Sequence, residues 1–212
     1  MSRRPFFLFA HGWGFDATLW DAMRDALPDA DTAVVERGYL GATPRRPDVP
    51  PGAILVGHSA GVLDLLSDPP PECAGLVAIN GFSRFAAAAG FPHGVPDRVL
   101  QRMLGRLALD PHATVAEFRA RCGSDAAVCG SLHPGRLREG LEALCERDLR
   151  ASLRRPGVRL LALAGVTDPI VPLALTRDCF EAAETIWHPA AGHLLPCTDP
   201  VWCADRLRAF AA

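Results

Sequence analysis

Short, continuous apolar runs alternate along most of the chain with amphipathic segments. The runs are typical of strands that are buried on both faces of a sheet. We predict such strands at residues 6–10, 32–35, 53–56, 75–79, 159–164 and 184–187. Helical periodicity appears between or after them, near 19–27, 62–66, 172–183 and 200–210. Strands that alternate with helices indicate an α/β fold with a mostly parallel sheet and helices on both faces.

The alternation stops at Phe82. From about residue 83 to residue 155 the sequence shows helical periodicity and no convincing strand, with helices predicted at 97–109, 114–122 and 137–153. Ligands of open α/β sheets bind outside the carboxyl ends of the strands. We therefore predict that 83–155 forms an all-helical lid over that edge, and that 1–82 and 156–212 together form the core.

Composition limits the class of protein. The 212 residues are 49% hydrophobic and 22% charged, which is typical of a globular chain and not of a disordered one. No apolar run reaches the roughly 18 residues of a transmembrane helix. The seven cysteines lack metal-ligand spacing, so reduced cysteines in a cytoplasmic protein are expected. We expect no metal, no organic cofactor, no nucleic-acid or membrane partner, and a monomer or weak dimer.

Charge distinguishes the lid from the core, although the formal net charge is only −2. All 22 basic residues are arginines, and 13 of them lie between residues 84 and 159, together with 8 acidic residues. The rest of the chain holds 9 arginines and 16 acidic residues. The lid is therefore basic and the core acidic.

The sequence Gly57-His58-Ser59-Ala60-Gly61 joins the strand predicted at 53–56 to the helix that follows it. A G-x-S-x-G sequence in this context places the serine on a strained strand-to-helix turn at the carboxyl end of the sheet. The two glycines remove side chains that would collide in such a turn. We therefore predict Ser59 to be a nucleophile, and His58 beside it to line the substrate pocket.

A serine hydroxyl needs a base that accepts its proton and a third group that orients the base. In this type of fold the partners follow in the order serine, acid, histidine, at the ends of later strands. Asp168 follows the strand predicted at 159–164, and His193 follows the last strand. His188 is the alternative base, but it lies at the strand end and directly before Pro189.

Ester hydrolysis also requires two N–H donors for the oxyanion, each worth about 3 kcal/mol of barrier. The turn at Ser59 supplies the amide of Ala60. The loop after the first strand, His11-Gly12-Trp13-Gly14, supplies the second donor, for which we predict the amide of Trp13.

These motifs resemble those of the α/β-hydrolases from residue 6 to residue 210. The opening Phe9-Ala10-His11-Gly12-Trp13-Gly14-Phe15-Asp16 is similar to that of the pimeloyl-acyl-carrier-protein methyl ester esterases of biotin synthesis, and 137–150 resembles the exit of their helical insertion. The resemblance implies Ser59, Asp168 and His193 as the catalytic triad, with Trp13 and Ala60 as oxyanion donors. One departure is His58, because the family commonly has tryptophan there.

The expected function is that of a serine carboxylesterase that forms an acyl-enzyme. The resemblance implies the methyl ester of a pimeloyl chain on an acyl carrier protein as its substrate. One alternative is a broad-specificity short-chain carboxylesterase without a carrier partner, and a lyase that uses the same triad is another. A third, of a different class, is a non-catalytic small-molecule-binding protein on a hydrolase scaffold. The expected pocket residues are His11, His58, Phe82 and Met103.

An acidic carrier is also supported by the helix predicted at 97–109. Its arginines recur at every fourth residue and therefore share a face, beside an apolar stripe of Val99, Met103 and Leu107. A basic face can steer and hold an acidic protein. The alternative is an ordinary solvated face in an arginine-rich chain. The arginines expected to bind the carrier are Arg98, Arg102, Arg106, Arg119 and Arg121, with Arg136 and Arg138 as an extension of the patch.

Overall fold

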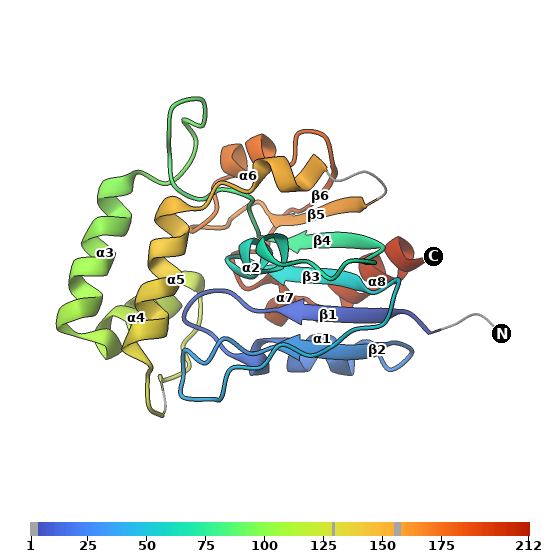
Figure 1. The fold of residues 1–212 in the computed structure, drawn as a ribbon, viewed down its shortest axis with the longest axis horizontal. Coiled ribbons are helices and arrows are strands. Elements are labelled where there is room, and N and C mark those ends of the chain that lie inside the picture. Colours follow the sequence, from blue (N-terminus) through green and yellow to red (C-terminus); the bar gives the residue numbers. More distant parts are fainter. Residues whose placement is uncertain (1–3, 129, 155–157) are drawn as a thin grey trace.

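One six-stranded sheet forms the centre of the molecule (Figure 1). The computed structural model describes residues 4–128, 130–154 and 158–212. The strands lie in the order β2-β1-β3-β4-β5-β6, and every neighbouring pair is parallel. Their bounds are β1 (Phe6–Ala10), β2 (Asp31–Val35), β3 (Ile54–His58), β4 (Gly75–Ile79), β5 (Arg159–Gly165) and β6 (Glu184–His188). The predicted α/β class and parallel sheet are confirmed.

The strand order reverses between β1 and β3, because the chain adds β2 on one side of β1 and all later strands on the other. Such a switch point is where open parallel sheets bind ligands. The loop that begins at His11 leaves the sheet there, and so does the turn at Ser59. The two predicted sources of oxyanion donors therefore leave the sheet from adjacent strand ends.

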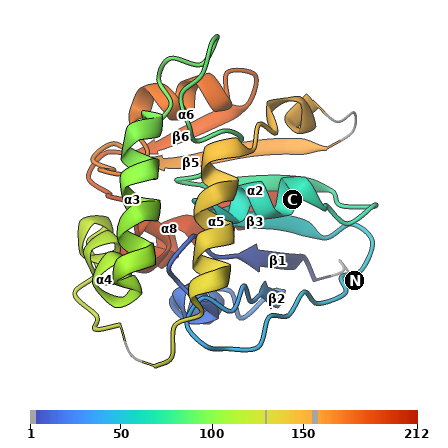
Figure 2. The same cartoon turned by 60° about the vertical axis from the view of Figure 1, so that its left-hand side comes forward.

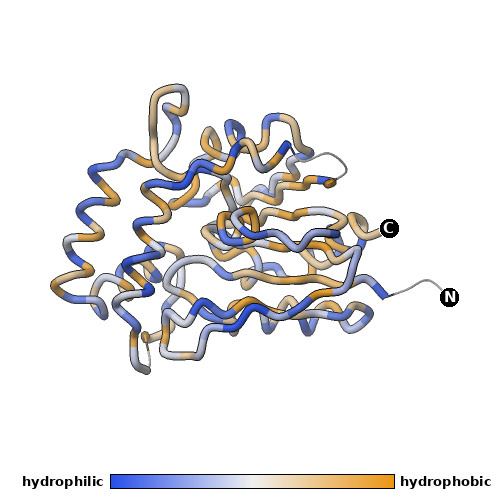
Figure 3. The backbone as a smooth tube through the Cα atoms, in the orientation of Figure 1, coloured by the Kyte–Doolittle hydropathy of each residue, from blue (hydrophilic) through white to orange (hydrophobic). Residues whose placement is uncertain are grey.

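Helices cover both faces of the sheet. The helix α2 (Gly61–Ser67) packs against β1 and β3 on one face. On the other face α1 (Asp21–Asp25), α7 (Leu195–Thr198) and α8 (Pro200–Ala211) contact one another (Figure 1). The helix α6 (Leu173–Cys179) connects β5 to β6 and lies near β6. The strands β3 and β4 are buried along their whole length, and hydrophobic residues dominate the central strands in Figure 3.

The segment predicted to be a lid contains three helices: α3 (Asp97–Leu109), α4 (Pro111–Cys122) and α5 (Pro134–Glu146). They lie at the carboxyl edge of the sheet, opposite the two chain termini, and α5 stands between α3 and the strands (Figures 1 and 2). The helix α3 packs on α4 and α5. Within the described part of 83–155 the extended residues form only isolated bridges, such as Ala86 with Val95.

Three predicted helices are shorter than expected, and one of them, predicted at 172–183, is α6 (Leu173–Cys179). The helix predicted at 19–27 is a 3-10 turn, η1 (Ala17–Trp20), followed by α1. The helix predicted at 137–153 divides into α5 and the 3-10 turn η2 (Arg150–Arg154). The chain leaves α5 because Arg147 is extended, and Asp148 then accepts hydrogen bonds from Arg84 and Arg150, each at 2.8 Å. Among the described residues, no helix has both the length and the apolar character needed to cross a membrane.

Candidate active site

Ser59 occupies the sharp turn between β3 and α2. Its φ is +54°, a left-handed conformation that non-glycine residues rarely adopt. Its N–H donates to the Ile79 carbonyl at 3.2 Å, and its own carbonyl accepts from the Val62 N–H at 3.1 Å. A Cβ on Gly57 would lie 2.7 Å from the Val62 nitrogen, and one on Gly61 would lie 2.6 Å from the Ala10 carbonyl carbon. Both glycines are therefore required by close backbone packing.

Asp168 and His193 form a buried pair at the ends of β5 and β6. The Asp168 Oδ2 accepts from His193 Nδ1 at 2.8 Å, and the two side chains are 1% and 0% exposed. The other carboxylate oxygen accepts from the N–H groups of Ile170 (2.7 Å) and Val171 (3.0 Å). Since Nδ1 carries the hydrogen that is donated to Asp168, the neutral ring keeps its lone pair on Nε2. This buried Nε2 has no hydrogen-bond partner in the described part of the chain.

His58 joins the serine turn to the His193 loop. Its Nε2 donates to the His193 carbonyl at 2.9 Å, and the two rings lie 4.8 Å apart between centroids. Burial lowers the pKa of His58 well below its ordinary value, and the neighbouring His193 lowers this pKa further. A neutral His58 that donates through Nε2 ties the His193 backbone to the turn that carries Ser59 and adds no charge.

The loop after β1 runs beside the serine. A Cβ on Gly12 would lie 3.0 Å from the Ser59 Cβ and 3.1 Å from the His58 Nδ1, so this backbone passes directly next to the turn. The loop is anchored by His11, whose Nδ1 donates to the Gly12 carbonyl at 3.0 Å and whose Nε2 accepts from the Arg37 N–H at 3.2 Å. The backbone of Gly12 is therefore placed next to the predicted nucleophile.

Glu36 connects the segment after β1 to the segment after β2. It accepts from the N–H groups of Ala17 (2.9 Å) and Gly38 (2.6 Å), and its Oε1 lies 3.5 Å from His11 Nε2. Burial alone would raise the pKa of Glu36, but the neighbouring His11 and the hydrogen bonds from the two amides lower it to about 2.

Comparison with known proteins identifies the family. No family model matches the chain. A pimeloyl-[acyl-carrier protein] methyl ester esterase of Aromatoleum aromaticum is 30% identical over 207 residues, which cover 81% of this chain and 82% of that protein. The chain belongs to this esterase family. A protein of the same name from Vibrio vulnificus is 27% identical and covers 98% of this chain and 94% of its own.

Solved structures agree on the fold of this esterase. An esterase from Exiguobacterium antarcticum matches with a TM-score of 0.82 over 100% of this chain and 93% of that chain, at 14% identity. A bromoperoxidase from Bacillus anthracis has the same TM-score at 17% identity, over 99% of this chain and 92% of that chain. The protein is thus an α/β-hydrolase that hydrolyses carboxylic esters.

The helices α4 and α5 contact the loop after β1. The Trp13 indole donates to the Leu137 carbonyl of α5 at 2.7 Å, and a Cβ on Gly140 would lie 2.7 Å from both the Trp13 ring and the Tyr39 hydroxyl. Phe118 of α4 packs edge-on against Trp13, with 5.0 Å between ring centroids. These contacts cover the site, and Ser59 is only 4% exposed.

The residues predicted to line the pocket occupy different places. His11 and His58 lie beside the serine turn, as described above. Phe82 is buried and stacks on Phe85 at 4.4 Å between ring centroids. Met103 is half-buried on α3, the outer helix of the lid, where Leu107 is buried and Val99 is 40% exposed. The structure therefore brings His11 and His58 to the predicted nucleophile, whereas Met103 packs within the lid.

The five arginines predicted to bind a carrier form two groups. Arg98 and Arg102 are exposed on α3, together with Arg106, which pairs with Glu117 of α4. The two arginines of α4 point toward the core instead. Arg119 lies 5.1 Å above the Phe15 ring, and Arg121 donates to the Pro169 carbonyl at 3.4 Å.

His188, the alternative base, has a structural role. Its Nε2 lies 3.2 Å from Asp199 Oδ2, and its Nδ1 accepts from the N–H groups of Ala190 (3.3 Å) and Ala191 (3.0 Å). Its ring also packs against Trp202. Both ring nitrogens are thus occupied at the turn after β6.

Two contributors to the site were missed by sequence reasoning. Phe15 packs edge-on against His58, with 6.2 Å between ring centroids. Asn80 binds the loops that carry Asp168 and His193. A polar residue followed by glycine at a strand end was the available signal for Asn80. Within residues 4–128, 130–154 and 158–212, no three His, Cys, Asp or Glu side chains are grouped to hold a metal ion.

Proposed function

We propose that this esterase hydrolyses the methyl ester of a pimeloyl chain carried on an acyl carrier protein, through Ser59, His193 and Asp168. The mechanism rests on the buried hydrogen bond between Asp168 and His193 Nδ1. This bond leaves the other ring nitrogen, Nε2, which has no hydrogen-bond partner among the described residues, available to act as the base. The choice of substrate rests on the similarity to the pimeloyl-[acyl-carrier protein] methyl ester esterases of Aromatoleum aromaticum and Vibrio vulnificus.

In the first half-reaction the Ser59 hydroxyl attacks the ester carbonyl and His193 Nε2 accepts its proton. The amides of Trp13 and Ala60 stabilise the oxyanion. The tetrahedral intermediate then expels methanol, which takes the proton from His193 and leaves an acyl-enzyme on Ser59. Water repeats the sequence and releases the free acid, while the Asp168 carboxylate orients and stabilises the imidazolium.

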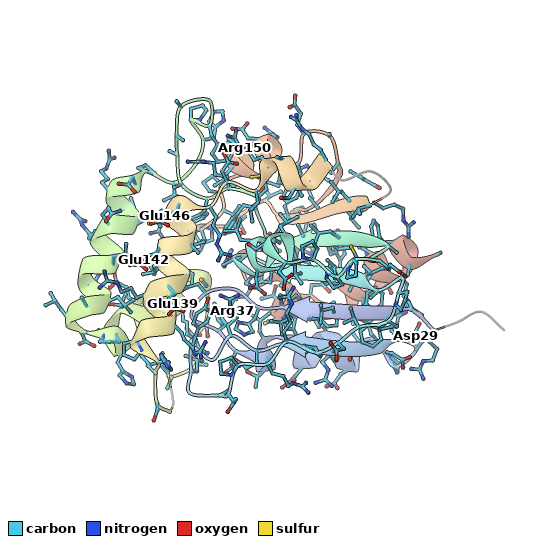
Figure 4. All side chains as sticks on the ribbon, in the orientation of Figure 1. Asp29, Arg37, Glu139, Glu142, Glu146 and Arg150 are labelled. Atoms are coloured by element: carbon cyan, nitrogen blue, oxygen red, sulfur yellow. The ribbon has the colours of Figure 1, made fainter. Side chains whose placement is uncertain are left out.

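A carrier would bind the exposed face of α3. Arg98 and Arg102 provide unburied positive charge there, whereas Glu139, Glu142 and Glu146 extend along α5 (Figure 4). An acidic partner is attracted by the arginines of α3. On α5, which also carries Arg136, the Arg138 guanidinium pairs with Glu142 at 2.8 Å, so this helix offers less free positive charge. We therefore assign carrier docking to Arg98, Arg102 and Arg106, and we leave out Arg119 and Arg121, which contact Phe15 and the Pro169 carbonyl.

Reversal of charge on α3 should separate carrier-bound from free substrates. The double variant Arg98→Glu/Arg102→Glu is expected to lower kcat/KM for a carrier-bound methyl ester at least about 10-fold, because electrostatic steering is lost. Hydrolysis of p-nitrophenyl acetate should stay within about 2-fold of the parent. Steady-state kinetics on both substrates measure the two effects.

The matched control is Arg4→Glu/Arg24→Glu, which changes the net charge equally on the opposite side of the core. It should leave both activities unchanged. Equal losses on the two substrates in the α3 variant would reject the carrier role and favour the short-chain carboxylesterase without a partner.

The biological substrate can be tested by complementation. The gene should restore growth without biotin to a bacterial strain that lacks its pimeloyl ester esterase, and the Ser59→Ala gene should not. Growth without biotin would fail if the enzyme acts only on unrelated esters.

We also propose a cytoplasmic location, because the six cysteines that the structure describes are all free thiols. The seventh, Cys129, lies outside the described residues.

A further inference from the structure

Asn80, the single asparagine in the sequence, occupies an unusual position at the end of β4. It is 1% exposed, and its φ of +46° lies in the left-handed region. Asparagine tolerates this conformation better than most residues. Its backbone N–H continues the sheet by donating to the Leu163 carbonyl of β5 at 2.8 Å. The turn therefore directs the Asn80 side chain beyond the strand end, to the edge where Ser59, Asp168 and His193 gather.

The Asn80 amide makes three hydrogen bonds there. Its Oδ1 accepts from the Gly165 N–H at 2.7 Å, and its Nδ2 donates to the carbonyls of Gly192 and His193, both at 2.8 Å. One side of the amide thus faces an N–H donor and the other side faces two acceptors. Only one orientation of the amide satisfies all three groups.

These bonds connect the two loops that carry the acid and the base. Gly165 ends β5 and opens the loop to Asp168, while Gly192 and His193 belong to the loop after β6. A Cβ on Gly165 would lie 2.8 Å from the Gly192 carbonyl oxygen, so the two backbones already touch. The Asn80 amide is bonded to both and sets their separation.

The His193 carbonyl is held from two sides. It accepts from Asn80 Nδ2 at 2.8 Å and from His58 Nε2 at 2.9 Å. The His193 ring is fixed separately by Asp168. The main chain and the ring of His193 are therefore both anchored. A shift of the main chain, which Asn80 holds, would change the direction in which Nε2 points.

We propose that Asn80 is a positioning residue for catalysis, which fixes the main chain of His193 relative to the Asp168 loop so that Nε2 reaches the Ser59 hydroxyl. The inference rests on the proposed triad. Asn80 touches neither substrate nor the reacting atoms. Its loss should therefore lower kcat and leave KM nearly unchanged. A small displacement of a catalytic group slows the chemical step more than it weakens substrate binding.

The variant Asn80→Asp tests this role with a side chain of the same shape. While the new carboxyl group is protonated, it can still accept from Gly165 and donate one hydrogen bond to the Gly192 or His193 carbonyl. Once ionised, it would face those carbonyls with negative charge. Burial and the two carbonyls should raise the pKa of this carboxyl group. Activity should therefore be nearest to the parent at low pH and fall as pH rises and the carboxyl group ionises.

The measurement is kcat and KM for p-nitrophenyl acetate between pH 5 and pH 9, with thermal unfolding recorded at each pH. At pH 8 we expect kcat about 10- to 100-fold below the parent, with KM within about 3-fold. The titratable side chains tied to this network are His58, His193 and Asp168, and they are the same in both proteins. The fall in kcat at high pH should therefore occur in Asn80→Asp and not in the parent.

Gln101→Glu is the matched control, because it changes an amide to an acid on the exposed face of α3. Its pH profile should follow that of the parent. If folded Asn80→Asp also follows the parent with unchanged kcat, the proposal is wrong. If Ser59→Ala keeps parental activity, the proposed triad itself is wrong. This result can be distinguished from a failure of the Asn80 proposal alone.

A second variant covers the case in which Asn80→Asp does not fold. Asn80→Gly adopts the positive φ without strain and removes all three side-chain hydrogen bonds. A kcat more than about 5-fold below the parent, with KM within about 3-fold, supports positioning, and any smaller loss of kcat overturns it. If neither variant folds, Asn80 serves only the structure and the proposal is also overturned.

Discussion

Replacement of Ser59 by alanine is expected to lower kcat for p-nitrophenyl acetate by about 10⁴- to 10⁶-fold. The reason is that the covalent route through an acyl-enzyme is lost, while the oxyanion donors and the base remain in place. Folding should be unchanged, because the Ser59 side chain lies in a turn whose backbone hydrogen bonds to Ile79 and Val62 are kept. Steady-state kinetics and thermal unfolding of the purified variant measure both quantities.

Ser83→Ala is the matched control. Ser83 is also a fully buried serine, near the same sheet edge, and its hydroxyl has no hydrogen-bond partner in the described part of the chain. The substitution should keep kcat within about 2-fold of the parent. If Ser59→Ala retained a comparable rate, ester cleavage would have to proceed without this nucleophile, and the proposed mechanism would be rejected.

Gly61→Ala is expected to destabilise the fold by more than about 3 kcal/mol. A Cβ at this position overlaps the carbonyl oxygen of Ala10 and approaches its carbonyl carbon to 2.6 Å. Neither backbone can retreat easily, because Ala10 pairs in register with Val35 and Gly57 on its two sides. Urea unfolding followed by circular dichroism should show a lower midpoint, and activity should fall because α2 moves with the serine turn.

The chain provides an opposite control in Gly105→Ala. Gly105 lies inside α3, and a Cβ there meets nothing within 4 Å. Alanine should therefore stabilise the protein by about 0.5–1 kcal/mol through helix propensity. A Gly61→Ala protein as stable as its parent would show that the end of β1 is not closely packed against α2.

The core elements could be predicted from sequence because their signals are local. The strand predicted at 75–79 and the helix predicted at 97–109 have the bounds that the structure gives them. The position of Ser59 was readable because the glycines around it are a steric requirement. Asp168 and His193 could be placed at one sheet edge because parallel strands end together. Their assignment as catalytic residues remains a prediction.

Other features depend on contacts between distant segments and could not be read in this way. Asn80 binds residues more than eighty positions away, and no periodicity marks such a contact. The arginines of α3 and α4 look alike in sequence, yet Arg119 stacks on Phe15 whereas Arg98 is exposed. Figure 4 also shows Arg37 between α5 and the strand ends. This partly buried arginine pairs with Asp64 of α2, which also pairs with Arg46 at 3.0 Å.

The Trp13 indole is attached to α5 through the Leu137 carbonyl, and the amide of the same residue is the second proposed oxyanion donor. The position of α5 and the geometry of the proposed donor are therefore coupled. A substitution that shifts α5 is expected to disturb the donor at Trp13, even though α5 contributes no residue to the proposed triad.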